Sequence, residues 1–238
     1  TKTVQWVDFD NDSDFDLFVT SNTNSNRLYQ NIGSMTFEDI SVSSGLNVLD
    51  NETYGGSWGD YNNDGWLDLY ICSRSATSGV GSNFLFKNNQ NSTFTDVNDI
   101  AGLTTENNLS FCAVFFDYNK DGWQDIYIAN DKYDIPNLLY KNNGNGTFLE
   151  VGEETGTNIS IDAMSTTIGD YNKDGWLDIY IANTINGNVF FKNNGDGTFT
   201  NVASENGTIF ESVAWGSVFL DAENDTDLDL YVSGELDG

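Results

Sequence analysis

Two stretches of the chain, DYNKDGWQDIYI (117–128) and DYNKDGWLDIYI (170–181), differ at one position of twelve. Three further stretches align with them without gaps: DFDNDSDFDLFV (8–19), DYNNDGWLDLYI (60–71) and DAENDTDLDLYV (221–232). The first aspartates of the five stretches lie 52, 57, 53 and 51 residues apart. Self-similarity at such a period is the sequence signature of a repeat architecture.

Two more blocks recur after the first four of these stretches. The second block reads NRLYQN (26–31), NFLFKN (83–88), NLLYKN (137–142) and NVFFKN (188–193), and the third carries phenylalanines at 37, 94, 148 and 199. Turn formers such as NNGDG (193–197) separate the two blocks, and helical periodicity is absent. Each period therefore predicts four short strands, which is typical of propeller blades. We predict an all-β fold, a β-propeller of four-stranded blades.

The repeat sets the expected domain organisation. The whole chain, 1–238, reads as one propeller region with repeats at about 1–52, 53–109, 110–162, 163–212 and 213–238. The last repeat lacks the second and third blocks, so its blade is incomplete and about 4.5 repeats are present. A seven-bladed ring would need about 370 residues at this period. The chain is then part of a larger propeller, or another segment completes the last blade.

The acidic part of each stretch is a candidate calcium loop. We number the loops from first to fifth (8–16, 60–68, 117–125, 170–178 and 221–229) and number positions from the first aspartate. Side-chain oxygens recur at positions 1, 3, 5 and 9, and position 7 could add a backbone carbonyl. The predicted ligands are Asp8, Asp10, Asp12, Asp14 and Asp16; Asp60, Asn62, Asp64, Trp66 and Asp68; Asp117, Asn119, Asp121, Trp123 and Asp125; Asp170, Asn172, Asp174, Trp176 and Asp178; and Asp221, Glu223, Asp225, Asp227 and Asp229. Six or so hard oxygens suit Ca²⁺, at about one ion per loop and up to five in all.

Charge repulsion makes these loops costly without a cation. The chain has 37 acidic and 9 basic residues, and 19 of the acidic ones lie in the loops, five in each end loop and three in each middle loop. Two carboxylates about 4 Å apart repel by about 4 kcal/mol at an effective dielectric of 20. Five ions of charge two would change the formal net charge from -28 to -18.

The loops differ from EF-hands at position 12. An EF-hand requires a bidentate glutamate there. The five stretches instead carry aliphatic residues: Val19, Ile71, Ile128, Ile181 and Val232. These loops therefore run directly into buried strands. The end loops are less regular, because Ser13 and Thr226 replace the position-6 glycine, which accommodates a positive φ.

Loops of the DYNNDGWLDLYI type, together with NNGDGTF turns, resemble the FG-GAP and VCBS repeat proteins, among which integrin α-subunit propellers are best known. The resemblance covers essentially the whole chain. It implies a seven-bladed propeller, calcium in loops on one face, and extracellular binding or adhesion. Five loops exceed the three or four usual in the integrin version, and no separate ligand-binding insert is evident.

Composition excludes several classes of function. A formal charge of -28 argues against nucleic acid as a partner, because phosphate binding needs a basic face. The chain has no histidine, which removes the commonest general base, and the close carboxylate pairs are assigned to metal, so we expect no enzyme activity. No stretch approaches the ~18 apolar residues of a membrane span. Thr1 is not an initiator methionine, so we expect a mature or excised piece.

Three smaller features have two interpretations each. The position-7 tryptophans could form a sugar-stacking platform or pack between adjacent blades, and their regular spacing favours packing. Cys72 and Cys112 lie in apolar runs and are either buried thiols or a disulfide between neighbouring repeats. If the protein is a glycoprotein, the favoured acceptors are in inter-strand loops: Asn51, Asn108, Asn158 and Asn206.

The function most consistent with these features is a secreted or cell-surface calcium-binding propeller that binds an extracellular protein or glycan. Extracellular calcium is millimolar, which matches calcium modules of ~10⁻⁴ to 10⁻³ M affinity. One alternative is a structural subunit that self-associates head to tail through the incomplete blade into a filament. Another is a carbohydrate-binding, lectin-like module.

Overall fold

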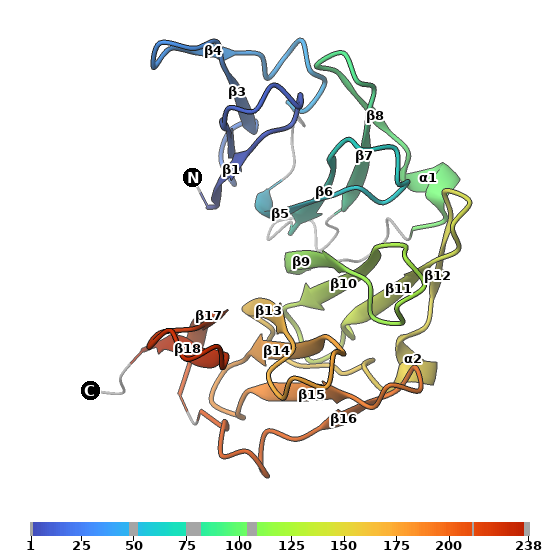
Figure 1. The fold of residues 1–238 in the computed structure, drawn as a ribbon, viewed down its shortest axis with the longest axis vertical. Coiled ribbons are helices and arrows are strands. Elements are labelled where there is room, and N and C mark those ends of the chain that lie inside the picture. The colour runs from blue at the N-terminus through green and yellow to red at the C-terminus, as the bar shows by residue number, and fades with distance from the viewer. Residues whose placement is uncertain (1, 48–51, 75–81, 104–108, 211, 236–238) are drawn as a thin grey trace. The chain divides into compact units, whose positions relative to one another are not determined.

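The computed structural model describes residues 2–47, 52–74, 82–103, 109–210 and 212–235 (Figure 1). Thr1, Asn51 and Asn108, named above, lie outside these ranges. Within them the chain is all β apart from two one-turn helices. No helix in the described residues is long and apolar enough to cross a membrane.

In the described residues, four sheets have four antiparallel strands each, and a fifth sheet has two. The strands of the first two sheets are β1 (Val4–Val7), β2 (Asp16–Val19), β3 (Arg27–Asn31), β4 (Phe37–Asp39), β5 (Thr53–Gly59), β6 (Asp68–Ser73), β7 (Phe84–Asn88) and β8 (Phe94–Asp96). Those of the third and fourth are β9 (Ser110–Phe116), β10 (Asp125–Asn130), β11 (Leu138–Asn142), β12 (Phe148–Glu150), β13 (Ser165–Gly169), β14 (Asp178–Ala182), β15 (Val189–Asn193) and β16 (Phe199–Asn201). The fifth sheet consists of β17 (Ala214–Leu220) and β18 (Asp229–Gly234).

The strands lie where the repeat predicts them. In each four-stranded sheet neighbours in sequence are neighbours in space, and the second and third blocks form the third and fourth strands. The first two strands of each sheet flank an acidic loop, with Val7 opposite Asp16 in the first sheet and Gly169 opposite Asp178 in the fourth. The prediction of repeated four-stranded antiparallel units is confirmed.

Two short helices were not expected. Helix α1 (Asn98–Ala101) follows β8 and α2 (Gly152–Thr155) follows β12. Each ends at a glycine in the left-handed region, Gly102 (φ 73°) and Gly156 (φ 79°), which is a common helix C-terminal arrangement. A single turn is too short to produce a hydrophobic period, so the sequence pattern could not indicate it.

The chain divides into two compact units, Thr1–Ala113 with Asn143–Phe148 and Val114–Asn142 with Leu149–Gly238. In the first unit one apolar cluster joins Phe18 and Leu28 of the first sheet to Leu69 and Phe86 of the second. In the second unit Tyr180 and Phe190 of the fourth sheet pack with Phe219 of the fifth. In both units the core therefore lies between consecutive sheets, as expected for repeats that bury their faces against neighbours.

Regular spacing in the second block predicts four aromatic core residues, Tyr29, Phe86, Tyr140 and Phe191, and three of them are buried. Phe86, Tyr140 and Phe191 are at most 5% exposed, whereas Tyr29 in the first sheet is only partly buried. Cys72 is buried, Cys112 is partly buried, and both are free thiols. Burial, with Cys112 as a lesser contribution, raises the pKa of the Cys72 thiol well above its ordinary value.

Candidate metal loops

The first aspartate of every loop organises the turn. Its two carboxylate oxygens accept hydrogen bonds from the backbone N–H groups of positions 5 and 6. For Asp117 the donors are Asp121 at 3.1 Å and Gly122 at 2.8 Å. The same pair of bonds forms at Asp8, Asp60, Asp170 and Asp221, with lengths between 2.7 and 3.2 Å. Position 1 therefore has a structural role in addition to any role as a ligand.

Left-handed residues tighten each loop at two positions. At position 6, Gly65, Gly122 and Gly175 have φ of 86°, while Ser13 and Thr226 adopt φ of 76° and 75°. The irregular end loops thus keep the same backbone. Position 4 is also left-handed in all five loops, with φ between 55° and 59°; its residues are Asn11, Asn63, Lys120, Lys173 and Asn224. Three asparagines there were a usable signal, because asparagine tolerates this region better than most residues.

Position 9 places an aspartate in the interior at the start of the second strand. The side chains of Asp16, Asp68, Asp125 and Asp178 are fully buried. One carboxylate oxygen accepts the backbone N–H of the last asparagine of the third strand, at 2.8 Å in each of the first four loops. Burial raises the pKa of Asp16 and Asp178 to about 6, and that of Asp68 and Asp125 to about 7.

The first loop brings three carboxylates together. Within the described residues, Asp8, Asp10 and Asp16 are the group whose ligand oxygens all lie within 4.8 Å of one another. Buried oxygens Oδ1 of Asp10 and Oδ1 of Asp14 have no hydrogen-bond partner. Calcium–oxygen distances of 2.3–2.6 Å put opposite ligands about 4.8 Å apart, so this cluster has dimensions that fit one Ca²⁺.

In two of the middle loops an asparagine amide nitrogen faces a carboxylate. Asn62 Nδ2 donates to Asp68 Oδ2 at 3.3 Å, and Asn172 Nδ2 donates to Asp174 Oδ2 at 2.9 Å. In the fifth loop, a hydrogen bond with Asp229 raises the pKa of Glu223. Each arrangement offsets carboxylate repulsion that a bound cation would also relieve.

Among the position-7 residues, Trp176 contacts a neighbouring turn and the preceding loop. Trp66, Trp123 and Trp176 are partly buried. The Trp176 ring lies against Gly195, where an added Cβ would be 2.8 Å from Nε1, and Lys120 Nζ of the preceding loop lies 4.1 Å from a ring centroid. At the same position in the fifth loop, Asp227 forms an ion pair with Lys173.

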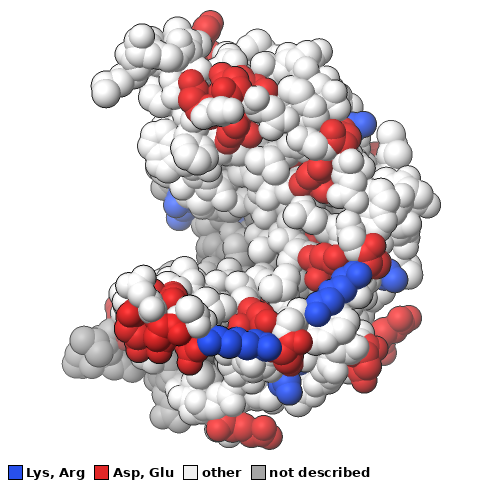
Figure 2. Space-filling view, viewed as in Figure 1, with Lys and Arg blue, Asp and Glu red and all other residues white. Residues whose placement is uncertain are grey.

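Residues of the second block that contact the loop acids were not identified from the sequence. Gln30 Nε2 donates to Asp10 Oδ2 at 2.6 Å, and Lys141 Nζ lies 3.9 Å from Asp121 Oδ2. Gln30, Lys87, Lys141 and Lys192 share one repeat position, which was the available signal. Figure 2 shows the acidic side chains in separate patches, some with a basic side chain lying against them.

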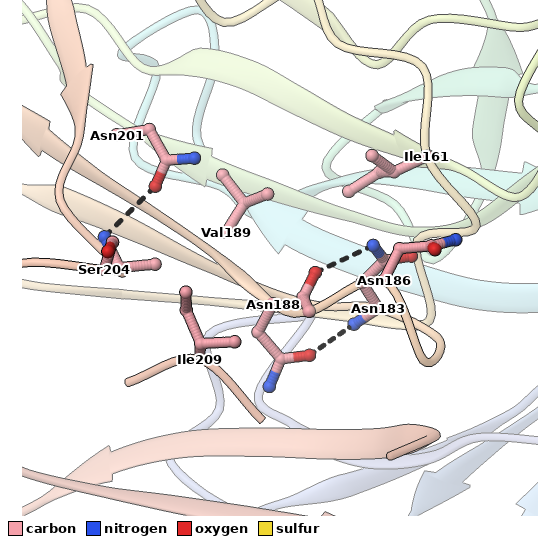
Figure 3. Close-up of a pocket in the computed structure, with 10 residues that line it drawn as sticks. Ile161, Asn183, Asn186, Asn188, Val189, Asn201, Ser204 and Ile209 are labelled. Atoms are coloured by element: carbon pink, nitrogen blue, oxygen red, sulfur yellow. Dashed lines mark hydrogen bonds between the residues drawn. The ribbon is translucent and has the colours of Figure 1, made fainter. Parts of the chain in front are cut away.

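A pocket of about 260 Å³ lies beyond the C-terminal end of β14, whereas the fourth acidic loop lies at the N-terminal end (Figure 3). Asn183, Asn188 and Asn201 contribute amides to its lining, and Ile161 and Ile209 contribute aliphatic walls. Asn183 Nδ2 donates to the Gly187 carbonyl at 2.8 Å, while its buried Oδ1 has no partner. Among the described residues that line this pocket none is charged, so their chemistry differs from that of the acidic loops.

Comparison with known families finds the FG-GAP-like repeat four times, over residues 8–71, 60–128, 117–181 and 170–232. Each match starts at the first aspartate of one loop and ends at position 12 of the next. No curated protein matches the sequence.

Among 59 matching chains of solved structures is one titled "Crystal structure of BBS1N in complex with ARL6DN, soaked with lead". It has a TM-score of 0.56 and 11% identity, and the match covers 98% of this chain. This chain spans 60% of the length of that one. At such low identity the likeness concerns the fold alone, which is β-propeller-like.

Proposed function

The chain belongs to the FG-GAP-like repeat family, and we propose on this premise that it is an extracellular binding module whose repeats are held in shape by calcium in the five acidic loops. Its repeated β-propeller-like fold supports a binding role in general. Calcium, the extracellular location, adhesion, and a protein or glycan partner are parts of the proposal.

The observation that carries the proposal is the carboxylate cluster of the first loop. Asp8, Asp10 and Asp16 have ligand oxygens within 4.8 Å of one another, and Asp10 Oδ1 is buried without a partner. A cation supplies the positive charge that lets these oxygens stay ionised at close range. The other loops share the backbone of the first loop, so we extend the proposal to them, with ligands at positions 1, 3, 5 and 9.

The acidic residues of the loops would serve structure rather than catalysis. Asp117 holds its own turn through two backbone N–H groups, and Asp125 is buried against the third strand. A glycosidase needs two carboxyl groups in different environments facing a substrate. We therefore propose that this region has no enzyme activity.

A calcium titration tests the proposal. We expect isothermal titration calorimetry to show binding of several calcium ions, and excess chelator to lower the melting temperature sharply. Magnesium is the matched control, because its stricter octahedral geometry should give much weaker stabilisation at equal concentration. Absence of calcium binding together with an unchanged melt in chelator would refute the proposal.

A lectin-like module is a second candidate, favoured by the pocket of Figure 3, whose described lining residues carry no charge, and not by the tryptophans. Its amides can bond hydroxyl groups, and its aliphatic walls can cover an apolar ring face. A glycan array in calcium tests this function. Ile209→Trp should fill the pocket and abolish binding, whereas Ile185→Trp, an exposed position outside the lining, should not. Equal binding by both variants would exclude the pocket.

A further inference from the structure

The first acidic loop carries more charge than the middle loops. It has five carboxylates, whereas each middle loop has three. One of the two extra charges is at position 3, where Asp10 stands in place of an asparagine. The other is at position 7, where Asp14 stands in place of a tryptophan. The number of charged ligands is one of the factors that set the calcium affinity of a site, so the first loop should attract the ion more strongly.

The position-3 oxygen of the first loop is also less engaged than its counterparts. Asp10 Oδ1 is buried and has no hydrogen-bond partner in the described part of the chain. In the middle loops the Oδ1 atom of the position-3 asparagine accepts the backbone N–H of position 5, at 2.9 to 3.0 Å; these residues are Asn62, Asn119 and Asn172. An oxygen that accepts such a bond has less capacity left for a metal ion. The first loop therefore has a ligand oxygen at position 3 that needs no rearrangement.

Gln30 in β3 holds the other oxygen of the same carboxylate. Its Nε2 donates to Asp10 Oδ2 at 2.6 Å, and the backbone N–H of the next residue, Asn31, donates to Asp16 Oδ1 at 2.8 Å. Two successive residues of one strand thus position the carboxylates of positions 3 and 9, which lie in the cluster with Asp8. Because the amide of Gln30 is neutral, it orients Asp10 without cancelling the negative charge.

Lysine stands at the repeat position of Gln30 in the next three repeats, as Lys87, Lys141 and Lys192. In the third loop Lys141 Nζ lies 3.9 Å from Asp121 Oδ2, at the predicted ligand position 5. An ammonium group beside a ligand repels a doubly charged ion. At a dielectric between that of a protein surface and that of water, one such charge several ångströms away should lower calcium affinity by about tenfold.

The fifth loop has as many acids as the first, but contacts already engage several of them. Lys173 of the fourth loop forms an ion pair with Asp227, and Glu223 at position 3 forms a hydrogen bond with Asp229. In the described residues the position-3 acid of the first loop, Asp10, instead meets the neutral amide of Gln30. The charge count alone therefore does not rank the loops, and the partners of the carboxylates must be included.

We propose that the first loop binds calcium before the other four, and that Gln30 sets this order by holding Asp10 as a ligand without adding a positive charge. The inference rests on the proposed calcium function and concerns the order in which the loops fill. At low calcium the ion then stabilises the first repeat alone. The loops that carry a lysine fill only at higher calcium, so the stability of the module rises in steps with calcium concentration.

Each loop has its own reporter for a test of this order. The backbone amide of position 6 bonds the position-1 aspartate in every loop; these residues are Ser13, Gly65, Gly122, Gly175 and Thr226. Calcium is titrated into the complete chain labelled with ¹⁵N, and amide NMR spectra give one midpoint for each loop. We expect the midpoint of Ser13 to be the lowest, about tenfold or more below that of Gly122.

Exchanging the residue at the Gln30 position should move single midpoints. Gln30→Lys should raise the midpoint of Ser13 by about tenfold, and Lys141→Gln should lower that of Gly122. Gln30→Met removes the hydrogen bond without adding charge, so its Ser13 midpoint should lie between those of the unchanged chain and Gln30→Lys.

The matched control is Lys132→Gln, which removes the same charge as Lys141→Gln. Lys132 is exposed and follows the C-terminal end of β10, whereas the third loop precedes its N-terminal end, so every midpoint should stay in place. The inference is overturned if calcium binds but Ser13 does not respond first, or if Gln30→Lys leaves its midpoint unchanged. If none of the five amides responds to millimolar calcium, the proposed calcium function itself is refuted, and the filling order with it.

Discussion

Residues that share a sequence pattern have different tasks in these loops. Position 1 holds the turn through two backbone N–H groups, whereas position 9 is buried at the start of a strand. Position 4, which contributes no predicted ligand, reaches the next loop: Asn11 Nδ2 donates to the Gly65 carbonyl at 2.9 Å, and Lys120 lies over Trp176. A variant at position 4 is therefore not a suitable control for a variant at a predicted ligand position.

Replacing Asp117 with alanine should destabilise the protein in calcium by about 2–4 kcal/mol, since two charge-assisted hydrogen bonds and a metal ligand are lost together. Thermal melts in millimolar calcium measure the effect. Asp134→Ala is the matched control, because Asp134 is exposed and lies outside the five loops. Equal losses of stability in the two variants would mean that Asp117 belongs to an ordinary solvated turn.

At the scale of the element, each loop connects the two strands of a hairpin. Its backbone conformation is the same whether or not position 6 is glycine. Ser13 and Thr226 take the left-handed conformation that glycine takes in the middle loops. The hydrogen bonds to Asp8 and Asp221 impose this conformation, because they bind the N–H of position 6 itself. The steric cost at a residue with a Cβ is about 1–2 kcal/mol.

Ser13→Gly should accordingly stabilise the first loop by up to about 1 kcal/mol, with part of the gain offset by greater freedom in the unfolded chain. Gly122→Ala should destabilise the third loop by about 1–2 kcal/mol. Urea denaturation of both variants measures the two free energies of unfolding. Changes of the same sign would contradict the assignment of position 6 as a strained left-handed site.

The buried position-9 aspartates predict an inverted pH dependence in the calcium-free protein. Their pKa values are about 6 for Asp16 and Asp178 and about 7 for Asp68 and Asp125, raised from 3.8 by burial. The folded chain then binds more protons than the unfolded one. This contribution to stability is complete below the unfolded pKa and is lost as pH rises through 6 to 7.

In chelator the melting temperature should therefore be higher at about pH 5 than at about pH 8. Saturating calcium should shrink or reverse the difference, because the ion favours the charged carboxylates. Asp125→Asn should weaken the dependence in chelator, since it removes one titrating group. A melting temperature that rises with pH in chelator would contradict this account. Asp39 and Asp196 have pKa values lowered by hydrogen bonds from Ser41 and Thr198, so they stay charged in this range.

At the scale of the molecule, the sequence repeat made the fold predictable. It did not predict how burial and contacts differ from one repeat to the next. Five aligned stretches predicted the loops, the strand order and four-stranded sheets. The same logic placed Tyr29 in the core with Phe86, but Tyr29 is only partly buried. It also missed Gln30 and Lys141 as contacts of the loop acids, because a shared repeat position does not show which residue of another segment a side chain meets.

The net charge of -28 predicts how salt acts on the whole protein. Repulsion between the acidic loops destabilises the compact state, and it is screened over a distance of about 10 Å at 0.1 M ionic strength. In chelator, raising sodium chloride from about 0.05 to 0.5 M should increase the melting temperature. In saturating calcium the increase should be smaller, because bound ions already neutralise much of the charge. An equal rise of the melting temperature in chelator and in calcium would contradict calcium binding in the loops. Calcium would then have left unchanged the carboxylate repulsion that salt screens.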